Sequence, residues 1–246
     1  MKQAGISSRP IRYYGKGIPY QQDTEVKGRL VVIEGPDASG RSTHIGMITA
    51  KLEADGHAVL NTGLRRSELV SEGIMQAKQE HMLGRRTMSL FYAADFADQL
   101  ENKIMPALRA GYVVLADRYI YTAFARDSVR GCHPRWVRNM YDFAVRPDIS
   151  FYFKVPVDVA FDRIVKGRPK LKYYEAGMDM NLSNDPYESY RIFQSRVVEQ
   201  YESMIGPENF VVVDGTTDIE EQQKAMRRTV MEMLPGFKGL AKEVTV

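Results

Sequence analysis

The feature that most constrains this chain is a glycine-rich run at residues 35 to 42, which directly follows a run of apolar, β-branched residues. It matches the phosphate-loop pattern G-x-x-x-x-G-K-S/T, except that Arg41 stands in the lysine position. In this pattern a strand leads into the loop and a helix leaves it, so that backbone N–H groups converge on a phosphate. The sequence therefore predicts a nucleotide-phosphate site here, against the alternative of a glycine turn that binds nothing.

The residues of this loop have distinct predicted roles. Arg41 keeps the positive charge, and its forked guanidinium can grip phosphate oxygens in a bidentate way. The Ser42 hydroxyl is a candidate ligand for a Mg²⁺ ion that bridges the outer phosphates of ATP. The predicted ATP-binding residues are Gly35, Pro36, Asp37, Ala38, Ser39, Gly40, Arg41, Ser42 and Thr43.

Short apolar runs alternate with amphipathic stretches along the rest of the chain. The expected strands are residues 29–34, 57–61, 112–117, 149–155 and 210–214, and the expected helices include 42–55, 87–111, 157–167 and 185–205. Near-continuous apolar runs are typical of a parallel sheet that is covered on both faces. The order predicts an α/β, three-layer P-loop NTPase fold with a five-stranded parallel sheet flanked by helices, and with ligands beyond the carboxyl ends of the strands.

The domain boundaries follow from the same pattern. Residues 1–27 lack helical or strand periodicity and are expected to form an extension that is either laid on the domain or mobile. The catalytic domain is expected at 28–234, with a lid near 167–185, and residues 235–246 are expected to be a tail.

Composition limits the class of protein. Hydrophobic residues make up 44% of the chain and charged residues 26%, with no apolar run of membrane-spanning length and no secretory signal pattern at the start. The net charge of +3 is small for a nucleic-acid partner, and Cys132 is the one cysteine. The four histidines, at 44, 57, 81 and 133, have no metal-ligand spacing. We expect a cytoplasmic protein that binds neither membrane nor nucleic acid.

A second candidate site follows the third expected strand, at Asp117-Arg118-Tyr119. An aspartate at this sheet edge can hold a magnesium-bound water, and the adjacent guanidinium can clamp an acceptor phosphate in line for transfer. An Asp-Arg surface pair without function is the alternative. With Ser42, Asp117 completes the predicted metal site.

From about Gly28 to Leu234 the chain resembles the thymidylate kinase family of P-loop nucleoside monophosphate kinases. The resemblance is carried by residues 32–43, 92–119, 147–164 and 193–201, and by the Asp-Arg-Tyr motif within 115–125. It implies transfer of the γ-phosphoryl group of ATP to a nucleoside monophosphate, with dTMP as the acceptor, Mg²⁺ as cofactor and a homodimer. It also implies that Asp37 approaches the acceptor sugar and that Arg118 holds the acceptor phosphate.

The chain departs from the family around the acceptor base. Tyr92 falls where the family has a stacking phenylalanine, and Phe96 where it has a base-reading arginine. The family's acceptor-contacting arginine after the second strand is either missing or supplied by Arg65 or Arg66, and Arg126 and Asp127 correspond roughly to a tyrosine and a glutamine of the family. The predicted acceptor-binding residues are Asp37, Tyr92, Phe96, Arg118 and Tyr119. Other acceptors (dUMP, UMP or dCMP), a nucleoside kinase, a nucleotide-binding relative without turnover and a nucleic-acid-binding NTPase stay open.

The segment after residue 167 is basic and has no clear period, which is typical of a lid. Arg168 is the first candidate for stabilising charge on the transferring group, and Arg163 the second. Ala38 fits family members in which the lid supplies this charge. A solvated basic loop is the alternative. The predicted catalytic residues are Arg41, Asp117, Arg118 and Arg168.

Overall fold

The computed structural model describes residues 8–21, 24–168 and 170–234. Its main sheet has five strands in the order β4-β5-β3-β6-β7, and every neighbouring pair is parallel. The strands are β3 (Arg29–Glu34), β4 (Val59–Gly63), β5 (Val113–Asp117), β6 (Ile149–Lys154) and β7 (Val211–Asp214). The predicted α/β class and five-stranded parallel sheet are therefore confirmed. The predicted tail at 235–246 lies outside the described residues.

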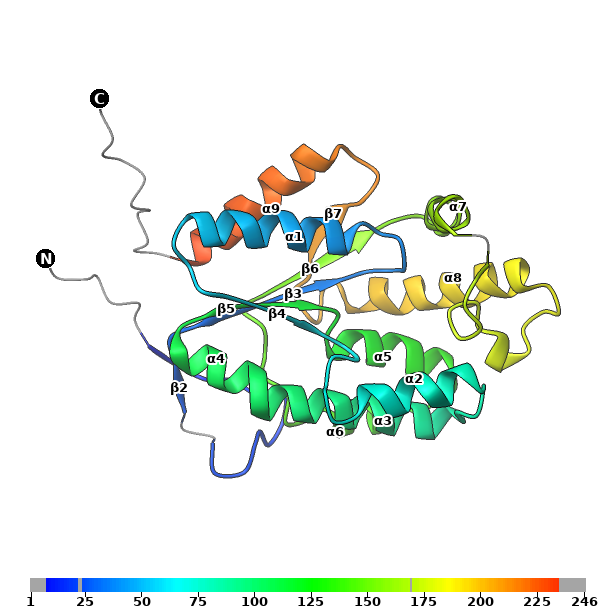
Figure 1. The fold of residues 1–246 in the computed structure, drawn as a ribbon, viewed down its shortest axis with the longest axis horizontal. Helices are drawn as coiled ribbons and strands as arrows, with labels where there is room; N and C mark the ends of the chain where they lie inside the picture. Colours follow the sequence, from blue (N-terminus) through cyan, green and yellow to red (C-terminus); the bar gives the residue numbers. More distant parts are fainter. Residues whose placement is uncertain (1–7, 22–23, 169, 235–246) are drawn as a thin grey trace, which may run out of the picture.

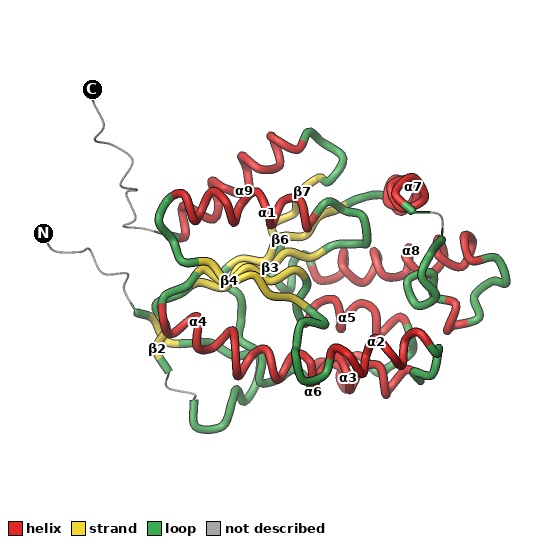
Figure 2. Tube along the Cα trace, viewed as in Figure 1, coloured by secondary structure: helices red, strands yellow, loops and turns green. Residues whose placement is uncertain are grey.

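Helices cover both faces of this sheet (Figures 1 and 2). On one face lie α1 (Arg41–Ala54) and α9 (Ile219–Met233). The other face carries α3 (Arg85–Gln99), α4 (Met105–Ala110), α5 (Ile120–Val129) and α8 (Pro186–Met204). The remaining helices are α2 (Ser71–Gln79), α6 (Pro134–Met140) and α7 (Val157–Gly167), with a 3-10 turn, η2, at Met178–Met180.

Alternate residues of the buried strands feed two separate hydrophobic layers. In β3, Leu30 and Val32 join the layer shared with α3, α5 and α8, whereas Val31 and Ile33 join the layer under α1 and α9. All four are fully buried. Because successive side chains of a strand point to opposite faces, a strand covered on both sides must be apolar at every position. For this reason the strands could be predicted from the sequence.

The predicted strands agree with the observed ones to within two residues at each end, but the predicted helix at 87–111 is divided. A π-helical segment, η1 (Leu100–Ile104), separates α3 from α4. Pro106 lies just beyond it, and a proline has no N–H to donate to the preceding turn. The helices α2, α5, α6 and α9 were not singled out from the sequence.

The amino-terminal strap, residues 8–21 and 24–27, is packed on the domain. Ile11, Ile18 and Val26 are buried in the larger core layer. A short antiparallel pair, β1 (Arg9–Pro10) with β2 (Glu25–Val26), closes the strap on itself. The described part of the strap therefore buries apolar side chains against the domain.

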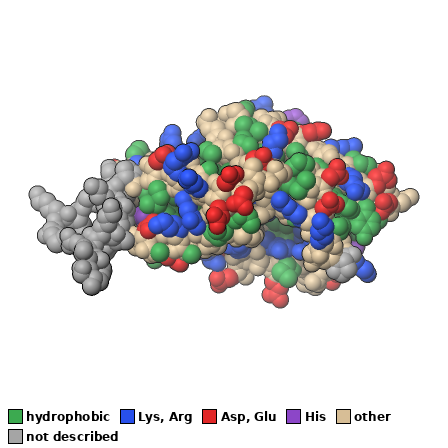
Figure 3. Space-filling model, turned by 90° about the horizontal axis from the view of Figure 1, so that it is seen from above, with side chains coloured by type: hydrophobic (Ala, Val, Ile, Leu, Met, Phe, Trp, Pro, Cys, Tyr) green, Lys and Arg blue, Asp and Glu red, His purple; other side chains and the backbone are tan. Residues whose placement is uncertain are grey.

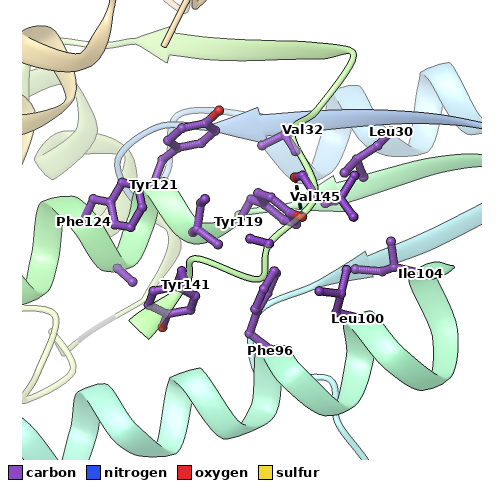
Figure 4. Packing of buried hydrophobic residues seen from close by; sticks show 14 of the residues in the cluster. Leu30, Val32, Phe96, Leu100, Ile104, Tyr119, Tyr121, Phe124, Tyr141 and Val145 are labelled. Carbon is purple, nitrogen blue, oxygen red and sulfur yellow. Dashed lines mark hydrogen bonds between the residues drawn. The ribbon is translucent and has the colours of Figure 1, made fainter. Parts of the chain in front are cut away.

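Phe96 and Tyr119 lie in the hydrophobic core, among the buried residues drawn in Figure 4. Phe96 is 2% exposed, and its ring meets those of Tyr119 and Tyr141 edge to face, with centroids 5.0 and 5.4 Å away. Tyr119 is 1% exposed and donates its hydroxyl to the backbone oxygen of Val145 at 2.9 Å. The sequence had placed both residues against the acceptor, and the structure places them in packing contacts instead.

On the surface, basic and acidic side chains are interspersed over the face seen in Figure 3. Among the described residues, no helix combines the length and the apolar character needed to cross a membrane.

We predict that Phe96→Ala lowers the free energy of unfolding by about 3–5 kcal/mol, because it removes a fully buried ring from an aromatic cluster. Leu90→Ala on the same helix is the matched control, since Leu90 is 54% exposed, and should cost less than about 1 kcal/mol. Urea unfolding of both variants measures the difference. Equal costs would show that Phe96 is not a core residue.

Candidate active site

The loop between β3 and α1 curls tightly because three of its residues have left-handed backbone conformations. Gly35, Ala38 and Gly40 have φ values of 147°, 59° and 95°. A Cβ atom on Gly35 would lie 2.8 Å from the backbone oxygen of Phe153, so only glycine fits there without a shift. The loop ends at the first turn of α1, where backbone N–H groups have no partner within the helix. This geometry suits a phosphate.

Arg41 is 8% exposed and is turned into this loop. Its Nη1 donates to the backbone oxygens of Gly35, at 2.6 Å, and Pro36, and to Ser39 Oγ at 3.0 Å. Its Nε donates to Asp117 Oδ1 at 2.9 Å. The guanidinium therefore braces the loop from inside and joins it to the end of β5. The Nη2 group takes no part in these four contacts.

Asp117 lies beside the loop because β5 pairs with β3 in a register that places Ile33 opposite Asp117. On its other side β4 places Gly63 opposite Asp117, and a Cβ on Gly63 would lie 2.3 Å from the Asp117 backbone oxygen. Ser42 Oγ donates to Asp117 Oδ2 at 3.4 Å. These two hard oxygen donors fit Mg²⁺, which takes few protein ligands and keeps water and phosphate oxygens in its shell.

Asp37 connects the loop to the neighbouring helix α5. Its two oxygens accept hydrogen bonds from Arg118 Nη2 at 2.6 Å and Arg126 Nη2 at 2.7 Å. Burial alone would raise the pKa of Asp37, but Arg126, Arg118 and Arg41 together hold it below its usual value. The carboxylate is therefore charged and fixes the direction of both guanidinium groups.

A buried acid supports this arrangement from below. Glu34, the last residue of β3, accepts hydrogen bonds from the Tyr119 N–H at 2.8 Å, the Thr122 hydroxyl at 2.7 Å and the Tyr201 hydroxyl at 2.8 Å. Burial raises the pKa of Glu34, against the opposing effect of Arg118 and of these hydrogen bonds. Thr122 Oγ1 in turn accepts from Arg118 Nη1 at 3.2 Å. Glu34 thus holds the start of α5 against the sheet.

A cavity of about 620 Å³ opens beside Asp37 and Asp117. Its size suits a nucleotide-sized ligand. Basic side chains outnumber acidic ones on its wall, which favours an anionic ligand. The basic lining residues are Arg65, Arg66, Lys78, Arg118, Arg126, Arg130 and Lys172.

Tyr92 forms part of the same wall. Its hydroxyl accepts a hydrogen bond from Lys78 Nζ at 3.1 Å. Burial would raise the pKa of Tyr92, but the charges of Lys78, Arg126 and Arg65 lower it overall. The ring therefore has a fixed position and can offer its face to a planar ligand.

Asp127 is a buried acid on the cavity wall, 4% exposed. Its Oδ2 makes no hydrogen bond to any other residue that the structure describes. Burial raises the pKa of Asp127 to about 6, although Ser89, Arg130 and Arg126 oppose the rise. Asp127 is therefore a buried titrating acid in the cavity wall.

The segment after α7 forms another part of the cavity wall. Lys172, Tyr173, Tyr174 and Glu175 line it. Tyr174 accepts the Leu83 N–H at its hydroxyl, at 3.2 Å, and Tyr173 stacks on His81 with centroids 3.7 Å apart.

The two arginines proposed to stabilise charge on the transferring group have different partners. Arg168 is tied to Glu175 in an ion pair, whereas Arg163 donates to the backbone oxygens of Ala38, at 3.3 Å, and Gly215, at 2.9 Å. Lys172 is the basic residue of this segment that lines the cavity.

The structure brings most of the residues proposed from the sequence together. The phosphate loop, Asp117, Arg118 and Tyr92 meet at one end of the sheet, and Arg65 and Arg66 share the cavity wall with them. Glu34 and Asp95 were missed. Asp95 is fully buried and holds the turn after β4 by accepting the N–H groups of Arg65 and Ser67. An acid placed at a strand end or inside an apolar helix face is the signal that could have found them.

Comparison with known proteins gives a consistent result. Residues 33–226 match the family model described as thymidylate kinase. The chain is similar to the probable thymidylate kinase 2 of Saccharolobus solfataricus, with 37% identity over 210 residues, covering 85% of this chain and 98% of that protein. It is also similar to the thymidylate kinase of Bacillus pumilus, with 30% identity over 221 residues and the same coverage of 85% and 98%.

We predict that the stability difference between Asp127→Asn and the unmodified chain depends on pH. The raised pKa of Asp127 means that the folded state binds its proton more tightly than the unfolded state does, so the stability that this group contributes is lost as pH rises through about 6. From pH 4 to pH 7, the free energy of unfolding of the Asp127→Asn variant should rise by about 2 kcal/mol relative to that of the unmodified chain. Paired urea melts at each pH measure this, and a difference that is constant with pH would contradict the burial of a titrating acid.

Proposed function

The chain belongs to the thymidylate kinase family of nucleoside monophosphate kinases, and from this we propose that it transfers the γ-phosphoryl group of ATP to dTMP, giving dTDP and ADP. The observation that carries the proposal is the ion-paired bridge from Asp37 of the phosphate loop to Arg118 and Arg126 beside the cavity. Donor and acceptor phosphates then lie at one sheet edge. A homodimer and a cytoplasmic location, which the resemblance implies, belong to the same proposal.

The donor side is the loop and the start of α1. Its backbone N–H groups would take the β-phosphate of ATP, and Arg41 would keep the loop in the curled form through its contacts with the Gly35 and Pro36 oxygens. Ser42 and Asp117 would hold Mg²⁺, which supplies charge neutralisation at the outer phosphates when bound. Asp117 is kept in place by Arg41 Nε.

The acceptor side is the cavity. Arg118 would hold the dTMP phosphate, with Arg66 nearby, since Arg66 Nη2 lies 4.0 Å from Asp117 Oδ2. Asp37 would face the deoxyribose. Tyr92 would stack on the base, and Asp127, which lines the same cavity, would lie near the base edge in the place that the sequence had given to Phe96.

Transfer needs no covalent intermediate on the protein. The acceptor oxygen attacks the γ-phosphorus and the bond to the β-phosphate oxygen breaks, so the protein has to align the two oxygens and balance the charge on the three equatorial ones. Arg118 and Lys172 both line the cavity. The segment 170–180 would exclude water, which otherwise competes as acceptor.

An acceptor screen tests the proposal. Purified protein with ATP and Mg²⁺ is offered dTMP, dUMP, dCMP or UMP in turn, and ADP release is followed in a coupled assay. We expect the highest kcat/KM with dTMP, and a loss of about 100-fold or more in Arg118→Ala, with the ATP affinity retained. A rate of ADP release that does not depend on the acceptor, or no ADP release with any of the four monophosphates, would contradict the proposal.

The lid can be tested separately. Lys172→Ala should lower kcat with dTMP by about 100-fold and change the dTMP KM by less than about threefold, because the charge matters most during transfer. Arg168→Ala should also lower kcat, through the loss of its ion pair with Glu175, so that Glu175→Ala reproduces its effect and the double variant is no worse. An unchanged kcat in Lys172→Ala would show that the Lys172 charge takes no part in the transfer.

A further inference from the structure

The amino-terminal strap contacts the back of helix α5 through the ring of Tyr14. This ring meets Tyr121 edge to face, with centroids 6.1 Å apart and planes at 78°, and Phe124 at 6.4 Å and 85°. The Tyr14 hydroxyl shares a hydrogen bond with the Tyr121 hydroxyl and donates to Glu208 Oε2 at 3.2 Å. Aromatic pairs in this arrangement contribute more than their buried area alone.

The strap itself is fastened to the segment between α6 and β6. The Tyr14 N–H donates to the Ala144 oxygen at 3.0 Å, and the Gly15 N–H donates to the Asp142 oxygen at 2.7 Å. The Arg146 guanidinium lies over the Tyr14 ring, 4.4 Å from its centroid. The ring is therefore held between this segment and α5.

The other side of α5 carries the acceptor residues. Thr122 orients Arg118, Arg126 bonds to Asp37, and Asp127 lines the cavity. Tyr121 and Phe124 are three residues apart and face the strap, whereas Thr122 and Arg126 are four apart and face the site. Helix α5 therefore contacts the strap on one side and carries residues of the acceptor side on the other.

The match to the family model begins at residue 33, so the strap lies before the matched part of the chain. We propose that Tyr14 is a positioning residue for acceptor binding: its ring supports the Tyr121–Phe124 side of α5 and so fixes Arg118 and Arg126. The inference rests on the proposed function for its substrate, dTMP. The donor side should depend less on Tyr14, because Arg41 also braces the phosphate loop through the Gly35 and Pro36 oxygens, contacts that do not involve α5.

Steady-state kinetics of three full-length variants test this. Tyr14→Ala should raise the dTMP KM about tenfold and leave the ATP KM within about twofold, since a misplacement of about 1 Å is enough to weaken a clamped phosphate. Tyr14→Phe should stay within about twofold of the unmodified chain, because the ring contacts remain. Tyr13→Ala is the matched control: Tyr13 is the neighbouring strap residue, and its hydroxyl bonds to the Gln21 oxygen within the strap.

Hydrogen exchange of the peptide that spans 120–129 gives a readout that does not require turnover. Tyr14→Ala should speed exchange in this peptide, and Tyr13→Ala should not. An unchanged dTMP KM in Tyr14→Ala, or an equal rise in Tyr13→Ala, would overturn the positioning role. If the unmodified chain phosphorylates none of the monophosphates, the proposed function fails, and faster exchange in Tyr14→Ala alone would still support the mechanical link, whereas unchanged exchange would overturn that link too.

Discussion

The two-armed ion pair of Asp37 with Arg118 and Arg126 is the interaction on which the rest of the site depends. Asp37 belongs to the phosphate loop, whereas Arg118 lies two residues before α5 and Arg126 lies in its last turn. Without this carboxylate, two guanidinium groups would face each other across a partly buried space, and their repulsion would open the cavity. With it, the loop that would hold ATP and the wall that would hold the acceptor become one rigid unit.

Backbone strain is concentrated at the same place. Arg118 has a φ of 70°, a left-handed conformation that costs free energy in a residue with a side chain. It is held there because its N–H donates to the Ile33 oxygen at 3.0 Å, and because Glu34 fixes the next turn of the chain through the Tyr119 N–H. The strained residue is the one whose guanidinium has to point back at the loop, so the strain follows from the geometry that the site needs.

Residue patterns explain what could and could not be predicted from the sequence. The strands were predictable because each is buried on both faces, and Asp117 and Arg118 were predictable because parallel strands end at one sheet edge. Phe96 was predicted to bind the acceptor but is a core residue. The sequence of an amphipathic helix does not indicate whether an aromatic residue on it faces a cavity or the core. The contacts of Tyr14 could not be predicted from the sequence for a different reason. Its partners, Tyr121 and Glu208, are more than a hundred residues away, and no local period records such a contact.

One contiguous site should take both nucleotides end to end. Isothermal titration with a bisubstrate analogue, adenosine joined to deoxythymidine through a chain of five phosphates, tests it most directly. We expect one binding event per chain, which saturating ATP and saturating dTMP each abolish. Competition by only one of the two nucleotides, or two independent binding events, would contradict it.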